Sequence, residues 1–356
     1  MVLLTEASRN LFTRPPEEHY PSFEAIQADA SAQRDRCTEH DAKDTTILFS
    51  ENGQSVHFGD LTFDLTPYAL AQLAAMAKVP MPVLERINGE TRAKVLNQCF
   101  PRNKRWKCAL ADGDHLRAIT SDRYERVFDA DVLEEVNRWL LGSGFIPAVP
   151  TINTDEHGTN VMGNTKPALF RSDRDMFAFF YSDKQPGDDG LGGLRKGVFV
   201  WNSEVGHKSF GFSTFWHRET CSNMLVWDAS DIRTRRARHT GRVKHVVREF
   251  HEDLVRIGSE ITTAEYDVFQ RAKETPFVPH GTDEHSDVIK RLNKEFKVSE
   301  ADAREIVELA YLEENPGDLS VWGIVNGITS SAKAHRYAEA RTRMGVLAGR
   351  VLATAS

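Results

Sequence analysis

The stretch VFVWNSEVGHKSFGFSTFWH, residues 198–217, decides the fold class of this chain. It contains two runs rich in aromatic and β-branched residues, 198–201 and 209–217, and such runs are typical of β-strands. In the second run large residues such as Phe210 and Phe212 share one parity, while small residues occupy the other. Because alternate side chains of a strand point to opposite faces, we expect one buried face and one small-residue face that can meet a ligand.

Upstream of this stretch, two dipeptides indicate β-hairpins. Asn52-Gly53 and Asp112-Gly113 both suit a two-residue turn, because these residue types tolerate positive φ angles. The apolar aromatic run at 176–181 predicts a further short strand. The hairpin strands are expected at 46–50 with 54–58 and at 106–111 with 115–120.

Apolar residues at steps of three and four predict helices in much of the remaining chain. The longest is expected at 241–273, where an apolar stripe runs from Val243 to Ile261. Ser299 is expected to cap a later helix that ends before Asn315. The other helices are expected at 22–34, 66–78, 81–88, 90–100, 129–141, 284–296, 299–314 and 320–353.

These elements predict an α+β fold with an antiparallel sheet core built from hairpins, a long helix and a helical C-terminal third. We expect three regions. Residues 1–45 form a partly ordered N-terminal arm, 46–240 form a mixed α+β core, and 241–356 form a helical region packed on the core. A chain of 356 residues, 40% of them hydrophobic, is large enough to fold without metals or disulfides.

Segment hydropathy and cysteine spacing indicate a cytoplasmic protein with no membrane role. No window approaches the roughly 18 unbroken apolar residues of a spanning helix. The N-terminus lacks the basic and apolar pattern of a secretory signal. The four cysteines show no C-x-x-C spacing, so we expect free thiols.

Charge is distributed unevenly, although the net charge is −7. Residues 1–90 hold 7 Lys and Arg against 14 Asp and Glu, whereas residues 195–250 hold 11 against 5. Guanidinium groups clustered near aromatic residues favour polyanion binding, because they bind phosphate in a bidentate fork. The nucleic-acid-binding candidates are Lys196, Arg218, Arg233, Arg235, Arg236, Arg238, Arg242 and Lys244.

The same basic segment has a structural interpretation. Its arginines can form salt bridges with carboxylates interspersed among them, such as Asp231 and Glu249, and the nearby tryptophans can be core residues. The glycine-rich stretch GDDGLGGLRKG, at 187–197, is expected to be a flexible loop that acts as a connector or as a clamp on a bound strand. It lacks the order of residues that a phosphate-binding P-loop needs.

The motifs do not assign a catalytic residue. His207, His217 and Cys221 are the tightest mixture of ligand types, yet a closed zinc site needs four ligands. The chain has no G-x-S-x-G elbow, and Cys221 is expected to pack as a small apolar residue. We therefore expect no metal site and no cofactor. The candidate pocket residues are Asn202, Ser203, Glu204 and Asn223.

Five segments, in this order, carry a resemblance to a known family. They are ITSDRYERVFDADVL, RSDRDMFAFFYSD, FVWNSEVGHKSFGFSTFWHRETCSNMLVW, RHTGRV and VWGIVNGITSSAKA. Together they resemble the phage and plasmid-related family classed as domain of unknown function 932, from about residue 46 to the C-terminus. The resemblance implies a mobile-element context in DNA replication or recombination, and it transfers no catalytic residue.

Three functions follow as hypotheses. The first is a protein of DNA metabolism that binds single-stranded DNA or RNA along a basic groove, as an annealing-like homo-oligomer. The second is an enzyme that acts on nucleic acid or a nucleotide through Glu204, His207, His217 or Cys221. The third is a non-catalytic protein that assembles with itself or with a partner.

Overall fold

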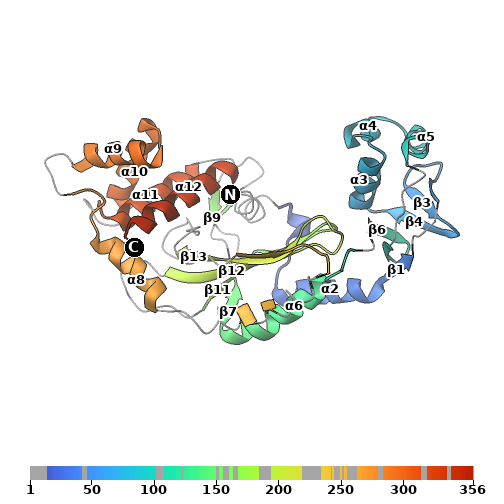
Figure 1. The fold of residues 1–356 in the computed structure, drawn as a ribbon, viewed down its shortest axis with the longest axis horizontal. Coiled ribbons are helices and arrows are strands. Elements are labelled where there is room, and N and C mark those ends of the chain that lie inside the picture. Colours follow the sequence, from blue (N-terminus) through green and yellow to red (C-terminus); the bar gives the residue numbers. More distant parts are fainter. Residues whose placement is uncertain are drawn as a thin grey trace.

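The computed structural model confirms the α+β fold and has two main β-sheets with a helical C-terminal region (Figure 1). The residues that the structure describes are 14–41, 46–101, 108–121, 123–149, 152–154, 160–162, 167–183, 194–218, 234–241, 243, 249–250, 252–254, 263–279, 284–313, 319–334 and 338–355.

The first sheet has the strand order β1-β5-β6-β4-β3-β2. Adjacent strands of this sheet are antiparallel, except for β4 and β6, which are parallel. Both predicted hairpins are confirmed here, and their turns place Gly53 and Gly113 at φ angles of 63° and 57°. The strands are β1 (Cys37–Asp41), β2 (Ile47–Phe49), β3 (Ser55–Phe58), β4 (Leu61–Leu65), β5 (Cys108–Asp112) and β6 (His115–Thr120).

Three helices pack on one face of the first sheet, at the right of Figure 1. Thr66 caps the first of them, because its hydroxyl accepts the N–H of Ala69 at 3.1 Å. Leu73, Leu84 and Leu96 then bury one side chain from each helix against the sheet. The helices are α3 (Pro67–Met76), α4 (Met81–Arg86) and α5 (Gly89–Cys99), as the sequence predicts.

The second sheet has the strand order β10-β11-β12-β13-β14, and β7 also pairs with β11. All of these pairs are antiparallel. A separate two-stranded sheet joins β8 (Ile152–Thr154) to β9 (Asn160–Met162). The strands of the second sheet are β7 (Phe145–Pro147), β10 (Leu169–Arg171), β11 (Met176–Ser182), β12 (Leu194–Asn202), β13 (Phe210–Arg218) and β14 (Thr234–Ala237).

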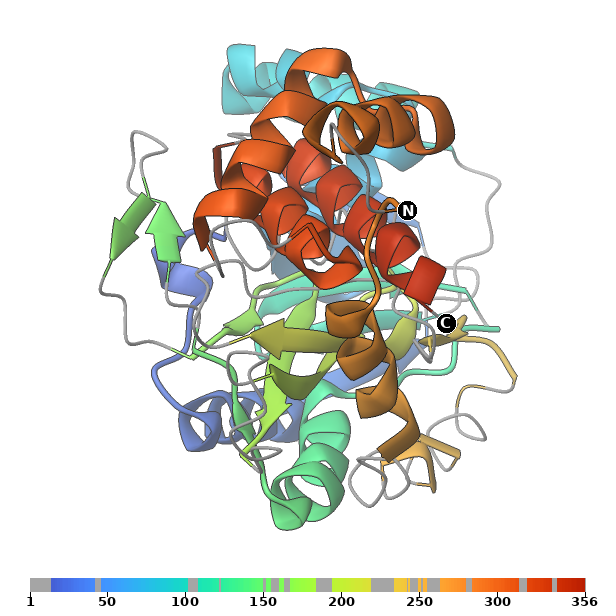
Figure 2. The same cartoon turned by 90° about the vertical axis from the view of Figure 1, so that its left-hand side faces the viewer.

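Both faces of the second sheet are buried, so the expectation of an open small-residue face on β13 is wrong. Phe212 lies on the face covered by α2 (Phe23–Arg36) and α6 (Asp129–Glu135), which continues as a π-helix, η2 (Val136–Leu140). Phe215 lies on the other face, in a cluster of aromatic side chains from β10, β11 and β12. Ser213, which lies between these two residues in the sequence, is fully buried. The helices are seen below the sheet in Figures 1 and 2.

The arm predicted at 1–45 contributes to both sheets within its described part. The predicted helix at 22–34 is confirmed as α2, preceded by a short 3₁₀ turn, η1 (Pro16–Glu18). The Ser22 hydroxyl caps α2 by accepting the N–H of Ala25 at 3.2 Å. Phe23 and Ile26 are buried against the second sheet, whereas β1 adds an edge strand to the first. The arm therefore connects the two sheets.

The loop predicted at 187–197 is wrong for its last four residues, because β12 begins at Leu194. Residues 187–193 lie outside the described residues. Gly197 pairs with Phe215, and a Cβ at this glycine would lie 2.3 Å from the phenyl ring. A polar, glycine-rich segment extends the strand here because glycine leaves room for a ring from the neighbouring strand.

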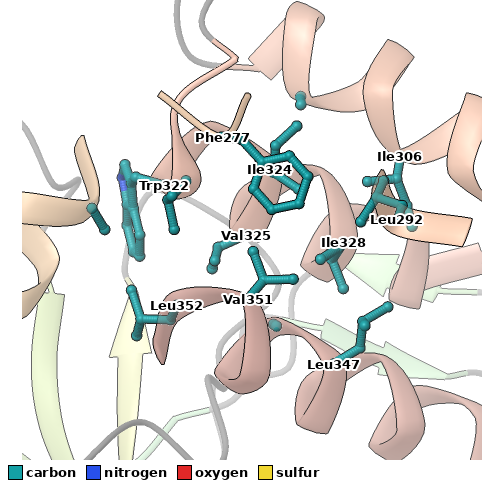
Figure 3. Close-up of a cluster of buried hydrophobic side chains, with 14 of the residues drawn as sticks. Phe277, Leu292, Ile306, Trp322, Ile324, Val325, Ile328, Leu347, Val351 and Leu352 are labelled. Carbon is teal, nitrogen blue, oxygen red and sulfur yellow. The ribbon is translucent and has the colours of Figure 1, made fainter. Parts of the chain in front are cut away.

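The C-terminal helices form one apolar core above the second sheet (Figures 1 and 2). Figure 3 shows side chains such as Leu292, Ile306, Ile328 and Leu347 meeting between the helices. Of the long helix predicted at 241–273, residues 243, 249–250, 252–254 and 263–273 are helical, Gly241 lies in a turn, and the other residues lie outside the described ones. The helices are α8 (Thr263–Glu274), α9 (Glu284–Phe296), α10 (Glu300–Glu313), α11 (Val321–Ala334) and α12 (Ala338–Leu352), and 3₁₀ turns η3 (Leu141–Ser143) and η4 (Ala353–Ala355) follow η2 and α12.

Among the described residues, no helix combines the length and apolar character that crossing a membrane requires.

Candidate functional site

Three of the candidate pocket residues lie where the two sheets meet. Asn202 ends β12, and Ser203 and Glu204 form the turn that follows it, with Gly206 at a φ angle of 82°. None of the three is more than 2% exposed. Glu204 forms an ion pair with Arg117, a residue of β6 in the first sheet. This pair joins the two sheets directly.

The second carboxylate oxygen of Glu204 caps a helix. Glu204 Oε1 accepts the backbone N–H of Asp129, the first residue of α6, at 2.8 Å. The N–H groups at a helix start have no partner within the helix, and an anion there is favourable. Arg171 of β10 lies 3.8 Å from the same oxygen. Both oxygens of Glu204 are therefore engaged by protein groups.

Asp129 and Arg171 extend the cluster towards α2. Arg171 Nε donates to Asp129 Oδ2 at 3.0 Å, and its Nη1 donates to Asp29 at 2.7 Å. Asn202 Nδ2 donates to Asp129 Oδ1 at 2.8 Å and to the Val127 carbonyl at 2.9 Å. Burial, followed by the neighbouring Glu204 charge, raises the pKa of Asp129, while Arg171 acts in the opposite direction.

The side chain of Ser203 stabilises the turn that follows β12. Its hydroxyl donates to the Arg174 carbonyl at 2.7 Å and accepts the N–H of His207 at 3.0 Å. The Tyr124 hydroxyl donates to the Ser203 carbonyl at 2.7 Å, and burial raises the pKa of this phenol. The turn is thus held on both sides by hydrogen bonds to other segments.

These contacts describe a buried ionic core, and we name Arg117, Asp129, Arg171, Asn202 and Glu204 the junction cluster. Burying charges is unfavourable unless they are paired and hydrogen-bonded, and here each charge has a partner of opposite sign. Two hollows on the C-terminal helices are lined by other residues. The contacts therefore support a role in joining the sheets.

The arginine-rich stretch contributes the edge strand β14. Antiparallel register places Arg235 opposite Phe212 and Arg236 opposite Gly211. In the part of the chain that the structure describes, β14 pairs with β13 alone, so its outer edge is unpaired. Arg238 directly follows the strand and is exposed.

The end of β14 is held to the junction by His239. The ring is 4% exposed, stacks on Tyr124 with centroids 5.0 Å apart, and pairs through Nδ1 with the Glu125 carbonyl at 3.1 Å. The backbone N–H of Glu125 also donates to the His239 carbonyl at 3.0 Å. Burial lowers the pKa of His239 to about 4, so the ring is neutral at physiological pH.

The remaining candidate residues have different placements. Lys196 is 6% exposed on β12, a position that does not suit a clamp on a surface ligand. His207 packs edge-on against Tyr68, with ring centroids 5.6 Å apart. Arg218 belongs to β13 by its backbone. The residues that lie outside the described ones are Cys221, Asn223, Arg233, Arg242 and Lys244.

The sequence did not reveal several members of this region. Asp129, Arg171 and His239 lie in the segments that carry the family resemblance, and Arg117 lies outside them, but no catalytic or binding pattern in the sequence marks any of the four. Their partners lie 42 to 142 residues away in the chain, so no local spacing could have identified them.

The described residues contain no cluster of three or more His, Cys, Asp or Glu side chains arranged to hold a metal ion. Cys37, Cys99 and Cys108 are free thiols, and burial raises the pKa of Cys37 and Cys108. Raised thiol pKa values disfavour the reactive thiolate.

No protein-family model, curated protein or solved structure matches this chain. The resemblance to the phage and plasmid-related family stays a prediction.

Proposed function

We propose that this chain binds single-stranded DNA or RNA through the edge strand β14 and the arginines around it. The observation that carries the proposal is the position of Arg235 and Arg236 on an edge strand, with the exposed Arg238 directly after it. Arg235 and Arg236 follow one another on β14 and Arg238 comes two residues later, and clustered guanidinium groups bind phosphate in a bidentate fork.

The junction supports this proposal by fixing the strand. His239 and Glu125 exchange two hydrogen bonds, so the end of β14 is held against a segment that leads into the junction cluster. A pre-organised cationic edge loses less conformational entropy on binding than a flexible one. The enzymatic alternative has less support, because both oxygens of Glu204 contact protein groups and its side chain is 1% exposed.

The wider role that we propose is that of a phage or plasmid-type protein in replication or recombination. In this role the chain acts in the cytoplasm as a homo-oligomer that lines up copies of β14 along one strand. Binding that depends on phosphate charge gives such an assembly little sequence preference. Its support is the family resemblance together with the basic edge strand.

The test is a titration of a labelled 30-nucleotide oligothymidylate at several salt concentrations. For single strands the logarithm of affinity falls with the logarithm of salt by about 0.7 for each phosphate contact. The triple variant Arg235→Glu, Arg236→Glu and Arg238→Glu is expected to lower affinity at least tenfold and to reduce this slope by about 2.

A matched control reverses three exposed cations elsewhere: Lys94→Glu, Arg138→Glu and Arg304→Glu. Each belongs to an i,i+4 ion pair on a helix surface, and such pairs contribute little to stability. This control is expected to keep most of the affinity. Equal loss in both variants, or an affinity that salt does not change, would reject the proposal.

A further inference from the structure

Helices α9 and α10 are joined by a tight three-residue turn. Lys297 adopts a left-handed conformation with a φ angle of 61°, which ends α9 and reverses the chain. Ser299 then caps α10, because its hydroxyl accepts the N–H of Asp302 at 3.1 Å. The buried Val298 between them packs into the core of the C-terminal helices. The turn is therefore fixed at each of its three residues.

Two adjoining hollows lie beside this turn. The first has a volume of about 490 Å³ and lies between the turn and α12, with Met344 and Leu347 in its lining. The second, of about 800 Å³, runs along α9 past Lys290 and Lys294. Because Lys297, Val298 and Ser299 line both, we treat them as one groove, the α9–α12 groove.

The groove is strongly cationic. Its only carboxylate among the lining residues is Asp302, which accepts a hydrogen bond from Ser299 at 2.7 Å. Its cations are Lys290, Lys294, Lys297, Arg343 and Arg350.

Among the described residues, carboxylate partners of these cations are few. Lys290 pairs with Asp287 at 3.0 Å, as surface cations of these helices commonly do. Within the part of the chain that the structure describes, no ion pair involves Lys294, Lys297, Arg343 or Arg350. Charges of one sign around a concave surface attract an oppositely charged ligand.

The floor of the groove is apolar. Met344 and Leu347 lie between Arg343 and Arg350 on α12, and Figure 3 shows Leu347 in the same cluster as Leu292 and Ile306. Val346 and Met344 remain partly exposed at the surface of the groove. A ligand with both acidic and apolar side chains matches this combination. Its carboxylates can pair with the cations at the rim, while its apolar side chains are removed from water by packing on the floor.

We infer that the α9–α12 groove binds an acidic peptide segment with apolar side chains, supplied by a partner protein. Nucleic acid fits less well. The lining aromatic residue, Phe296, is 9% exposed and lies under the Arg350 guanidinium at 5.5 Å, so it gives bases no stacking surface.

The probe is a fluorescein-labelled peptide of six aspartates and three leucines, followed by fluorescence polarisation with the full chain. The variant Arg343→Glu with Arg350→Glu is expected to weaken binding at least tenfold, and Arg304→Glu, on the other side of α10, is expected to leave it unchanged. Val346→Ser is expected to weaken binding of this peptide more than binding of an all-aspartate peptide. Circular dichroism confirms that each variant is folded.

The same proteins are titrated with the 30-nucleotide oligothymidylate, so this inference and the proposed function fail separately. Peptide affinity that is unchanged in the double Arg343 and Arg350 variant overturns the inference. A double variant that loses oligonucleotide affinity as strongly as peptide affinity also overturns it, because the groove is then a nucleic-acid site. Loss of peptide binding with oligonucleotide binding retained supports it.

Discussion

Arg117 and Glu204 form a buried ion pair across the junction of the two sheets. Their side chains are 4% and 1% exposed, and they come from β6 of the first sheet and the turn after β12 of the second. Glu204 also caps α6 through the N–H of Asp129. One carboxylate thus fixes the relative positions of a strand, a turn and a helix.

Removing Arg117 is expected to destabilise the whole fold. Arg117→Ala leaves Glu204 buried with Arg171 as its nearest cation, at 3.8 Å, and breaking a buried pair in this way costs about 3–5 kcal/mol. The free energy of unfolding is measured by urea denaturation. Glu90→Ala, which breaks the exposed pair with Lys94, is the control and is expected to cost less than about 1 kcal/mol. Similar values for the two variants would contradict the structural role of the junction cluster.

Gly327→Ala is expected to be destabilising although alanine favours helices by about 1 kcal/mol over glycine. A Cβ at Gly327 on α11 would lie 2.2 Å from the carbonyl oxygen of Ile306 and 2.9 Å from the Cβ of Ala310, both on α10. Overpacking against a backbone costs about 1–3 kcal/mol or more, so the helices must move apart. Thermal unfolding of this variant is compared with Gly142→Ala, where the nearest atom is 3.9 Å away. A variant as stable as the parent would show that α10 and α11 can separate freely.

The sequence predicted elements whose signals are local. The glycines of the two hairpins and the Ser299 cap of α10 act within four residues, and each is confirmed. The fold class followed from these elements and is confirmed as well.

Features that depend on distant partners were not predictable. β1 pairs with β5 across about 70 residues, and β4 runs parallel to β6, so neither pairing leaves a turn signal. Glu204 has no periodic pattern that marks it as buried, because its burial depends on Arg117 and on the start of α6. The prediction of an open face on β13 was wrong for a similar reason. The small residues of this strand face a second layer of aromatic side chains instead of solvent.

Phe269 is expected to hold the helical region against the second sheet. Its ring lies edge-on to Trp216 of β13 at 5.0 Å and to Trp322 of α11 at 5.5 Å, and it is 1% exposed. Phe269→Ala is expected to cost about 3–5 kcal/mol and to change the fluorescence of the tryptophans it contacts. Tyr311→Ala, at an exposed site on α10, is expected to change stability by less than about 0.5 kcal/mol. An unchanged emission spectrum in Phe269→Ala would argue against this packing.

The His239 ring is expected to make stability depend on pH. Its pKa is about 4 in the folded chain and about 6.5 in an unfolded one, because burial among Tyr124, Glu125 and Arg126 disfavours the charged ring. The unfolded chain therefore binds more protons between these values. The contribution of His239 is fully present above pH 6.5 and is lost as pH falls towards 4, by up to about 1.4 kcal/mol for each pH unit.

The measurement is the difference in unfolding free energy between the parent and His239→Gln across pH 4 to 7. The parent is expected to lose stability relative to the variant as pH falls, and His57→Gln on the exposed side of β3 controls for the loss of an imidazole elsewhere. Because His239 is the second residue after β14, acid is also expected to release the end of this strand from Glu125. Oligothymidylate affinity of the parent should then fall below pH 5 more steeply than that of His239→Gln. Parallel stability curves for parent and variant would show that the ring is not buried as a neutral group.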